Sequence, residues 1–113
     1  MLKIYHNARW SKSRAGLKFL QDKGLDFEIR EYLKDPLNKE EFGNILKKLN
    51  WKAFDLVRTQ EDIYKKEYKG LSFSEEEWIK VLLKHPKLMK RPLVETQLKA
   101  IWAVPAEEIE AFL

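Results

Sequence analysis

The order of the elements that the sequence predicts constrains the fold more than any other feature. Apolar and polar residues alternate in Leu2–His6, which predicts a short strand. Residues 11–23 then follow a helical pattern that Gly24 closes at a C-cap position, and residues 26–32 predict a second strand. Because a helix that joins two strands gives a right-handed unit with parallel strands, the N-terminal part predicts a βαβ unit.

Helical signals fill the middle of the chain, at about 37–90. Three capping-box patterns divide this stretch: Asn38 with Glu41, Thr59 with Asp62, and Ser74 with Glu77. They predict a helix after Asn38, a short helix near 61–68 and a longer helix near 75–85. The middle of the chain is therefore predicted to be a helical insertion.

The C-terminal part predicts a hairpin and a last helix. Segments 93–94 and 98–102 have the pattern of two short strands, and Pro105 is expected to begin the final helix. The complete order is β-α-β, helices, then β-β-α. It predicts one α/β domain over residues 1–113, with a mixed four-stranded sheet flanked by helices, which resembles the thioredoxin-like arrangement.

The absence of cysteine limits the chemistry of this chain of 113 residues. It excludes disulfides, thiolate metal sites, iron–sulfur clusters and every mechanism with a cysteine nucleophile. The two histidines, His6 and His85, show no metal-binding spacing, so we expect no metal site and no cofactor. Because no run approaches the roughly 20 apolar residues of a membrane span and the N-terminus lacks a signal-peptide pattern, we expect a cytoplasmic protein.

The charge distribution indicates a solvated surface. The net charge is +4, but basic and acidic residues are mostly interleaved, and only 84–91 is locally all basic. Nucleic-acid binding is therefore the less favoured interpretation of the basic charge.

The first predicted loop carries the most specific residues, Tyr5-His6-Asn7-Ala8-Arg9-Trp10-Ser11-Lys12-Ser13-Arg14. This segment resembles the active-site loop of the arsenate reductase family, the group of ArsC, Spx and glutaredoxin-like proteins, whose pattern is Tyr-His-Asn-Pro-x-Cys-x-x-Ser-Arg. Further segments match the family in order and spacing: 31–36, 57–59, 85–94 and 99–102. The resemblance covers nearly the whole chain and implies a thioredoxin-like fold.

The same resemblance places Trp10 where the family has its nucleophile. In the family, this cysteine opens a helix, and the helix dipole and a nearby histidine activate it toward arsenate. An indole cannot ionise to a nucleophile or form a mixed disulfide with glutathione. We therefore predict a degenerate site around Trp10, composed of His6, Asn7, Ser11 and Ser13, and a chain that is not a thiol-dependent reductase.

Three arginines hold the oxyanion in the family, and the resemblance puts them at Arg58, Arg91 and Val104. Two arginines are retained here and one is lost. The anion-binding candidates are the start of the first helix and the retained arginines: Ser11, Lys12, Ser13, Arg14, Arg58 and Arg91. The alternative, which we favour, is that acidic neighbours pair with both arginines, while the Trp10 side chain fills the entrance of the pocket that binds the oxyanion in the family. The resemblance also makes Arg91–Pro92 a candidate for a cis peptide bond.

Ser11 and Ser13 are predicted to cap the first helix rather than to replace the nucleophile, because His6 has no evident carboxylate to orient it.

The sequence leaves three hypotheses for function. The first is a non-catalytic binding or regulatory module with a protein partner. The second is a binder of small oxyanions or glutathione, or a residual enzyme, that uses Arg58, Arg91 and the helix start. The third is a nucleic-acid-associated regulator of the Spx type.

Overall fold

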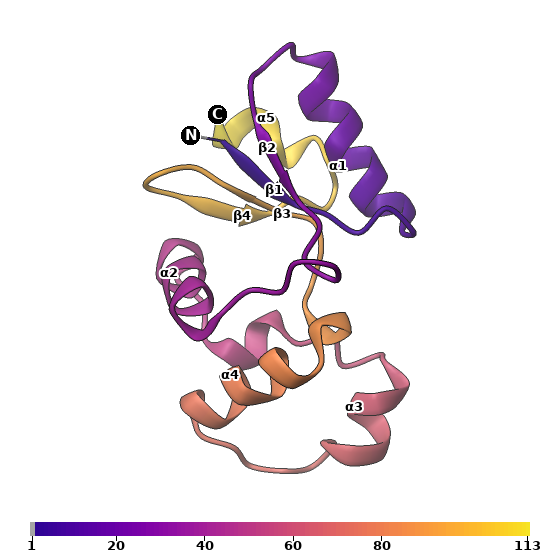
Figure 1. Cartoon of the computed structure of the whole chain (residues 1–113), viewed down its shortest axis with the longest axis vertical. Coiled ribbons are helices and arrows are strands. Elements are labelled where there is room, and N and C mark those ends of the chain that lie inside the picture. Colours follow the sequence, from indigo (N-terminus) through magenta and orange to yellow (C-terminus); the bar gives the residue numbers. More distant parts are fainter. Residues whose placement is uncertain (1) are drawn as a thin grey trace. The chain divides into compact units, whose positions relative to one another are not determined.

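The computed structural model describes residues 2–113, which divide into two compact units. The sheet unit comprises the described residues up to Pro36 together with Arg91–Leu113 (Figure 1). The helical unit comprises Leu37–Lys90, the same residues as the expected helical insertion. Within the described residues, no helix is long and apolar enough to cross a lipid bilayer.

The sheet unit contains one four-stranded sheet in the order β2-β1-β3-β4 (Figure 1). Its strands are β1 (Lys3–Tyr5), β2 (Glu28–Arg30), β3 (Leu93–Glu95) and β4 (Ala100–Trp102). Strand β1 pairs in parallel with β2 and antiparallel with β3, which also pairs antiparallel with β4. The predicted mixed sheet, βαβ unit and C-terminal hairpin are therefore confirmed.

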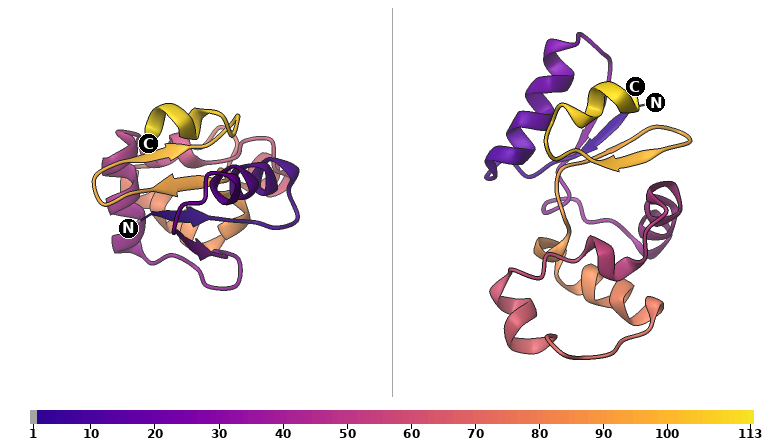
Figure 2. Two further views of the ribbon diagram at one scale, coloured as in Figure 1. Left: turned by 90° about the horizontal axis from the view of Figure 1, so that it is seen from above. Right: turned by 180° about the vertical axis from the view of Figure 1, so that it is seen from behind.

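Two helices cover one face of this sheet, α1 (Ser11–Asp22) and α5 (Glu108–Phe112) (Figure 2). Leu20 of α1 and Ile109 of α5 join Ile4 and Val94 of the sheet in one buried apolar cluster. This burial removes each apolar stripe from water and holds the layers together.

Helix α5 begins later than the sequence predicts. Pro105 precedes the helix in a tight turn, in which its carbonyl accepts a hydrogen bond from the Glu108 N–H at 3.0 Å. The next two turn bonds have the same i to i+3 spacing, so the chain tightens before the helix starts. The expected start at Pro105 is thus wrong by one turn.

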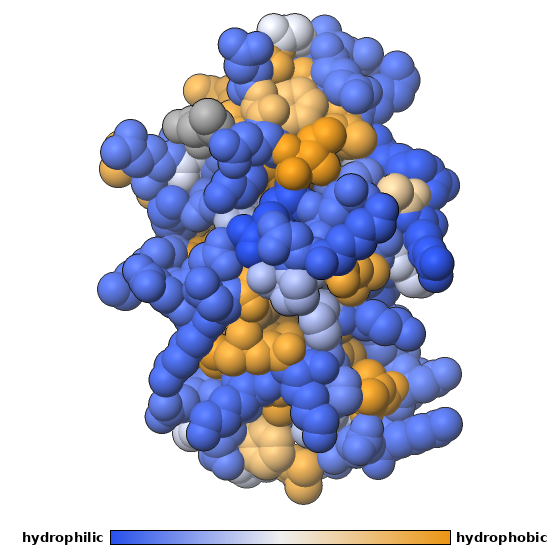
Figure 3. Space-filling view, viewed as in Figure 1, coloured by the Kyte–Doolittle hydropathy of each residue, from blue (hydrophilic) through white to orange (hydrophobic). Residues whose placement is uncertain are grey.

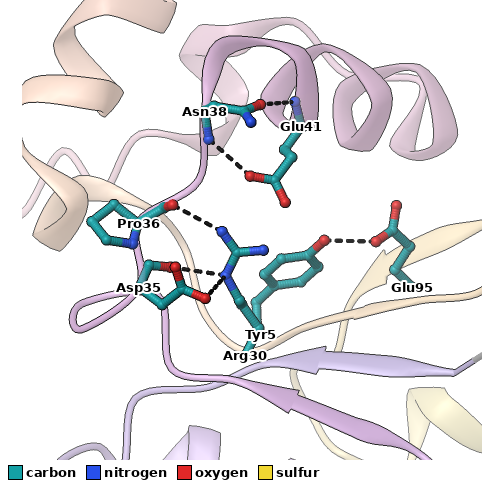
Figure 4. Close-up of polar contacts among 7 residues, drawn as sticks. All are labelled: Tyr5, Arg30, Asp35, Pro36, Asn38, Glu41 and Glu95. Carbon is teal, nitrogen blue, oxygen red and sulfur yellow. Dashed lines mark hydrogen bonds and ion pairs between the residues drawn. The ribbon is translucent and has the colours of Figure 1, made fainter.

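The helical unit contains three α-helices and two short 3-10 helices among its residues: α2 (Lys39–Leu49), η1 (Ala53–Leu56), α3 (Asp62–Glu67), α4 (Glu75–Lys84) and η2 (Pro86–Leu88). The capping boxes at Asn38 and Ser74 are present, and Figure 4 shows the first. The expected cap at Thr59 is wrong, because the N-cap of α3 is Glu61 and no side chain caps it. Helices as short as η1 and η2 lack a readable periodicity.

Aromatic packing holds α3 in the helical unit, because the helix itself has no buried residue. The Tyr64 and Tyr68 rings each lie 6.3 Å from the ring of buried Trp78, centroid to centroid.

Hydrophilic residues predominate on the face drawn in Figure 3, with separate apolar patches between them. This surface agrees with the interleaved charges of the sequence.

Candidate functional site

The loop between β1 and α1 is fixed by hydrogen bonds that meet at Ser13. The Ser13 side chain is fully buried, its hydroxyl accepts from the Asn7 backbone N–H at 2.9 Å, and it lies 2.8 Å from Nδ1 of His6. Oδ1 of Asn7 accepts from the Arg9 N–H, and the Asn7 carbonyl accepts from the Trp10 N–H, both at 3.1 Å. The loop therefore has a defined conformation before the helix begins.

His6 belongs to this hydrogen-bonded loop and is buried. Burial lowers the pKa of His6 below its ordinary value of 6.5, and the negative charge of Glu31 opposes that effect in part. The backbone N–H of His6 also donates to the Arg30 carbonyl at 2.9 Å. His6 is therefore a neutral side chain at pH 7 that positions the loop.

Helix α1 starts without a side-chain cap. Its N-cap residue is Trp10, in an extended conformation with φ −109° and ψ 130°, and the indole has no oxygen that accepts from the first N–H groups. The expected cap by Ser11 or Ser13 is wrong. Ser11 is the first helical residue, and the Ser13 hydroxyl turns back into the loop instead.

The Trp10 ring lies on the guanidinium group of Arg91. The Arg91 Cζ atom is 3.9 Å from the centroid of the indole, a cation–π contact, and Arg91 is only 6% exposed. Trp10 nevertheless remains 44% exposed. The ring therefore covers the arginine on one side and is itself partly exposed to solvent.

Contacts within the sheet unit hold Arg91 in place. The Trp102 indole N–H donates to the Arg91 carbonyl at 3.2 Å, and the following Arg91–Pro92 peptide bond is cis. A Cβ atom on Gly16 would lie 2.9 Å from Cγ of Pro92, so α1 approaches this segment as closely as glycine permits. Val104, at the third arginine position of the resemblance, supplies no cation.

Arg58 lies in the helical unit with an acidic neighbour. Its Nη1 atom is 3.0 Å from Oε2 of Glu61, and both side chains are mostly buried. Its backbone N–H donates to the Leu88 carbonyl at 2.7 Å. The i to i+3 spacing of Arg58 and Glu61 was visible in the sequence, although only the helical unit as a whole buries the pair.

Comparison with known proteins identifies the family. The model of the ArsC family matches residues 5–112 of this chain. The chain belongs to the ArsC family.

Relatives support the family assignment over the full length of the chain. The uncharacterized protein YfgD of Escherichia coli K12 is 39% identical over 110 residues, which cover 96% of this chain and 92% of that protein. An arsenate reductase of Neisseria meningitidis serogroup A is 36% identical over 116 residues, covering 99% and 97%. The solved structure of an arsenate reductase from Vibrio cholerae superposes with a TM-score of 0.94 at 30% identity, covering 99% and 97%.

Within this ArsC-family fold, the indole of Trp10 stands at the start of α1, where the resemblance places the family's cysteine. The sequence did not reveal the contact between Trp10 and Arg91, because the two residues are far apart in the chain and no local pattern links them. Across residues 2–113, no group of three His, Cys, Asp or Glu side chains is arranged to hold a metal ion.

Proposed function

We propose that this ArsC-family chain performs no thiol-dependent reduction and works instead as a non-catalytic binding module. The observation that carries the proposal is the indole of Trp10 at the N-cap of α1, stacked on Arg91. Reduction through a cysteine begins when a thiolate attacks the substrate, and the sequence contains no thiol. The indole N–H is only a hydrogen-bond donor and supplies no attacking atom.

The surroundings of the two retained arginines argue against capture of an oxyanion. The indole covers one face of the Arg91 guanidinium, and the Arg58 guanidinium pairs with Glu61. An oxyanion at Arg91 would have to fit beside the ring that covers one face of the guanidinium, and an oxyanion at Arg58 would have to compete with the Glu61 carboxylate. These contacts support a binding module over a small-anion binder.

The loop between β1 and α1 is held by hydrogen bonds around Trp10. Asn7 and His6, which precede Trp10, both contact the Ser13 hydroxyl in the first turn of α1. A half-exposed aromatic ring on a loop that hydrogen bonds already hold loses little conformational freedom when a partner covers it. Tryptophan is also among the residue types enriched in the anchors of protein interfaces. Both features support a protein partner.

An activity assay with a rebuilt site tests the proposal. The wild-type chain, given arsenate, glutathione and glutaredoxin, should match the control without protein. The double variant Trp10→Cys/Val104→Arg should gain a thiol that alkylates rapidly at neutral pH, since the start of α1 lowers the thiol pKa. The matched control is Trp10→Ser/Val104→Arg, which has the same arginine and no thiol. Turnover by the wild-type chain would contradict the proposal.

Thermal shift provides an independent test of the arginine contacts. Arsenate, phosphate, sulfate and glutathione should leave the melting temperature of the wild-type chain unchanged, because a ligand stabilises only a fold that binds it. The variant Trp10→Ala, which uncovers Arg91, should gain stabilisation by phosphate. A rise in the wild-type melting temperature would favour the small-anion hypothesis instead.

A further inference from the structure

The segment of the chain around Trp10 contains basic residues and no acidic residue. From His6 to Gln21 the sequence has no Asp or Glu, and the first turn of α1 has no acidic residue. Arg9, Lys12 and Arg14 are all exposed in this stretch. The positive end of the helix dipole adds to their charge at the same place.

The exposed cations are little neutralised by the rest of the protein. The Arg14 guanidinium donates to the Ala8 carbonyl at 2.9 Å, which fixes the group beside the loop and leaves its charge in place. Among residues 2–113, no acidic side chain forms an ion pair with Arg9 or Lys12. The surface therefore has a positive potential that attracts acidic groups.

The stack on Arg91 determines what the indole itself attracts. An isolated indole presents negative potential on both faces and attracts cations. Here the positively charged, buried guanidinium lies 3.9 Å from the ring centroid and partly cancels the negative potential of the ring from one face. A second cation on the ring is therefore disfavoured. A segment with an apolar side chain between carboxylates fits better, because the apolar group packs on the indole and the carboxylates lie beside the surrounding cations.

The size of the surface favours a peptide segment over a nucleic acid. Single strands are held by several aromatic platforms along a basic groove. Among the described residues of the sheet unit, Trp10 is the most exposed aromatic side chain, and the three cations lie within six residues, 9–14. One aromatic anchor with a compact cationic rim matches a short acidic segment.

We infer that Trp10, with Arg9, Lys12 and Arg14, forms a docking surface for an acidic segment of a partner protein. The segment places an apolar side chain on the indole and Asp or Glu residues beside the cations. This inference rests on the proposed function, because it names the class of partner for the same site. The indole supplies most of the affinity, and the charges supply selectivity and a fast approach.

Fluorescence anisotropy with labelled peptide pools tests the inference. The acidic pool alternates Asp or Glu with randomised apolar residues, and two matched pools carry Gln or Lys at the acidic positions. The acidic pool should bind best, with an affinity that falls as salt rises. Trp10→Ala should weaken binding at least about tenfold. Arg9→Glu and Lys12→Glu should weaken it further than Lys69→Glu, which changes the net charge equally from an exposed turn of the helical unit.

Three results would overturn the inference: equal binding of the acidic and Gln pools at low salt, unchanged binding by Trp10→Ala, or tighter binding of single-stranded oligothymidylate than of the acidic pool. Each result leaves the proposed loss of reductase activity intact, because the arsenate assay reports on that proposal alone. Conversely, arsenate turnover by the wild-type chain would remove the proposed function, whatever the peptides do.

Discussion

Helices α1 and α2 are of similar length but begin in opposite ways. At the start of α2, Oδ1 of Asn38 accepts from the Glu41 N–H at 2.8 Å and Oε1 of Glu41 accepts from the Asn38 N–H at 2.9 Å (Figure 4). Acidic residues occupy its first turn and basic residues its last. Helix α1 has no side-chain cap, no acid in its first turn and no base in its last.

The difference shows where each helix gets its stability. Local sequence specifies α2, since its caps and charges satisfy the free N–H groups and the helix dipole. Helix α1 depends on contacts from elsewhere in the sheet unit, namely the Ser13 network and the close approach of Gly16 to Pro92. An uncapped start also leaves positive charge available beside Trp10.

The largest effect is expected at Ser13. Ser13→Ala should destabilise the fold by about 2–3 kcal/mol, because the Asn7 N–H and Nδ1 of His6 both lose a buried partner. Urea denaturation measures the change. The control Ser11→Ala removes an exposed hydroxyl from the same helix turn and should stay within about 0.5 kcal/mol. Equal effects of the two variants would show that the loop network does not hold α1.

A pair of glycine variants tests packing in the two helices. Gly16→Ala should cost about 1–3 kcal/mol, since its Cβ would lie 2.9 Å from Cγ of Pro92. Gly43→Ala in α2 should stabilise by about 0.5–1 kcal/mol, because the new Cβ would meet no atom within 4 Å beyond the adjoining residues and backbone of its own helix, and alanine favours a helix. Thermal unfolding should move in opposite directions for the two variants. A shift in the same direction would contradict the proposed packing.

The cap of α2 should have a smaller effect. Asn38→Ala should destabilise by about 1 kcal/mol, because the Glu41 N–H loses its acceptor. Thr59→Ala is the matched control: its sequence pattern resembles a cap, but α3 begins without one, so a change within about 0.5 kcal/mol is expected. Chemical denaturation distinguishes the two. A full loss of cap stability at Thr59 would contradict the observed start of α3.

The smallest effect is a dependence of stability on pH through His6. Because burial lowers the pKa of His6 below 6.5 in the folded chain, the unfolded chain binds a proton more readily. The contribution of His6 to the free energy of unfolding should therefore be fully present above pH 6.5 and decrease as the pH falls through that value. His6→Asn retains a polar atom for Ser13 but does not titrate, so its curve should be flatter. Parallel curves for the two proteins would rule out this role for His6.

The sequence by itself determined much of the fold. The capping boxes at Asn38 and Ser74 predicted α2 and α4, and the strand patterns of 93–94 and 98–102 predicted the C-terminal hairpin. These features depend on neighbours within a few residues, so a local pattern carries their physical cause. The same holds for the missing nucleophile, which is a matter of residue type alone.

Only the tertiary structure decided how the candidate site is arranged. Packing within the sheet unit buries Arg91 and places it beneath the indole, and the loop network turns the Ser13 hydroxyl away from the helix start that it was expected to cap. Because β1 and β3 pair in the sheet, the loop before α1 and the segment before β3 lie side by side. Residues far apart in the chain meet in this way because the sheet must bury its apolar face, and no local pattern records that contact.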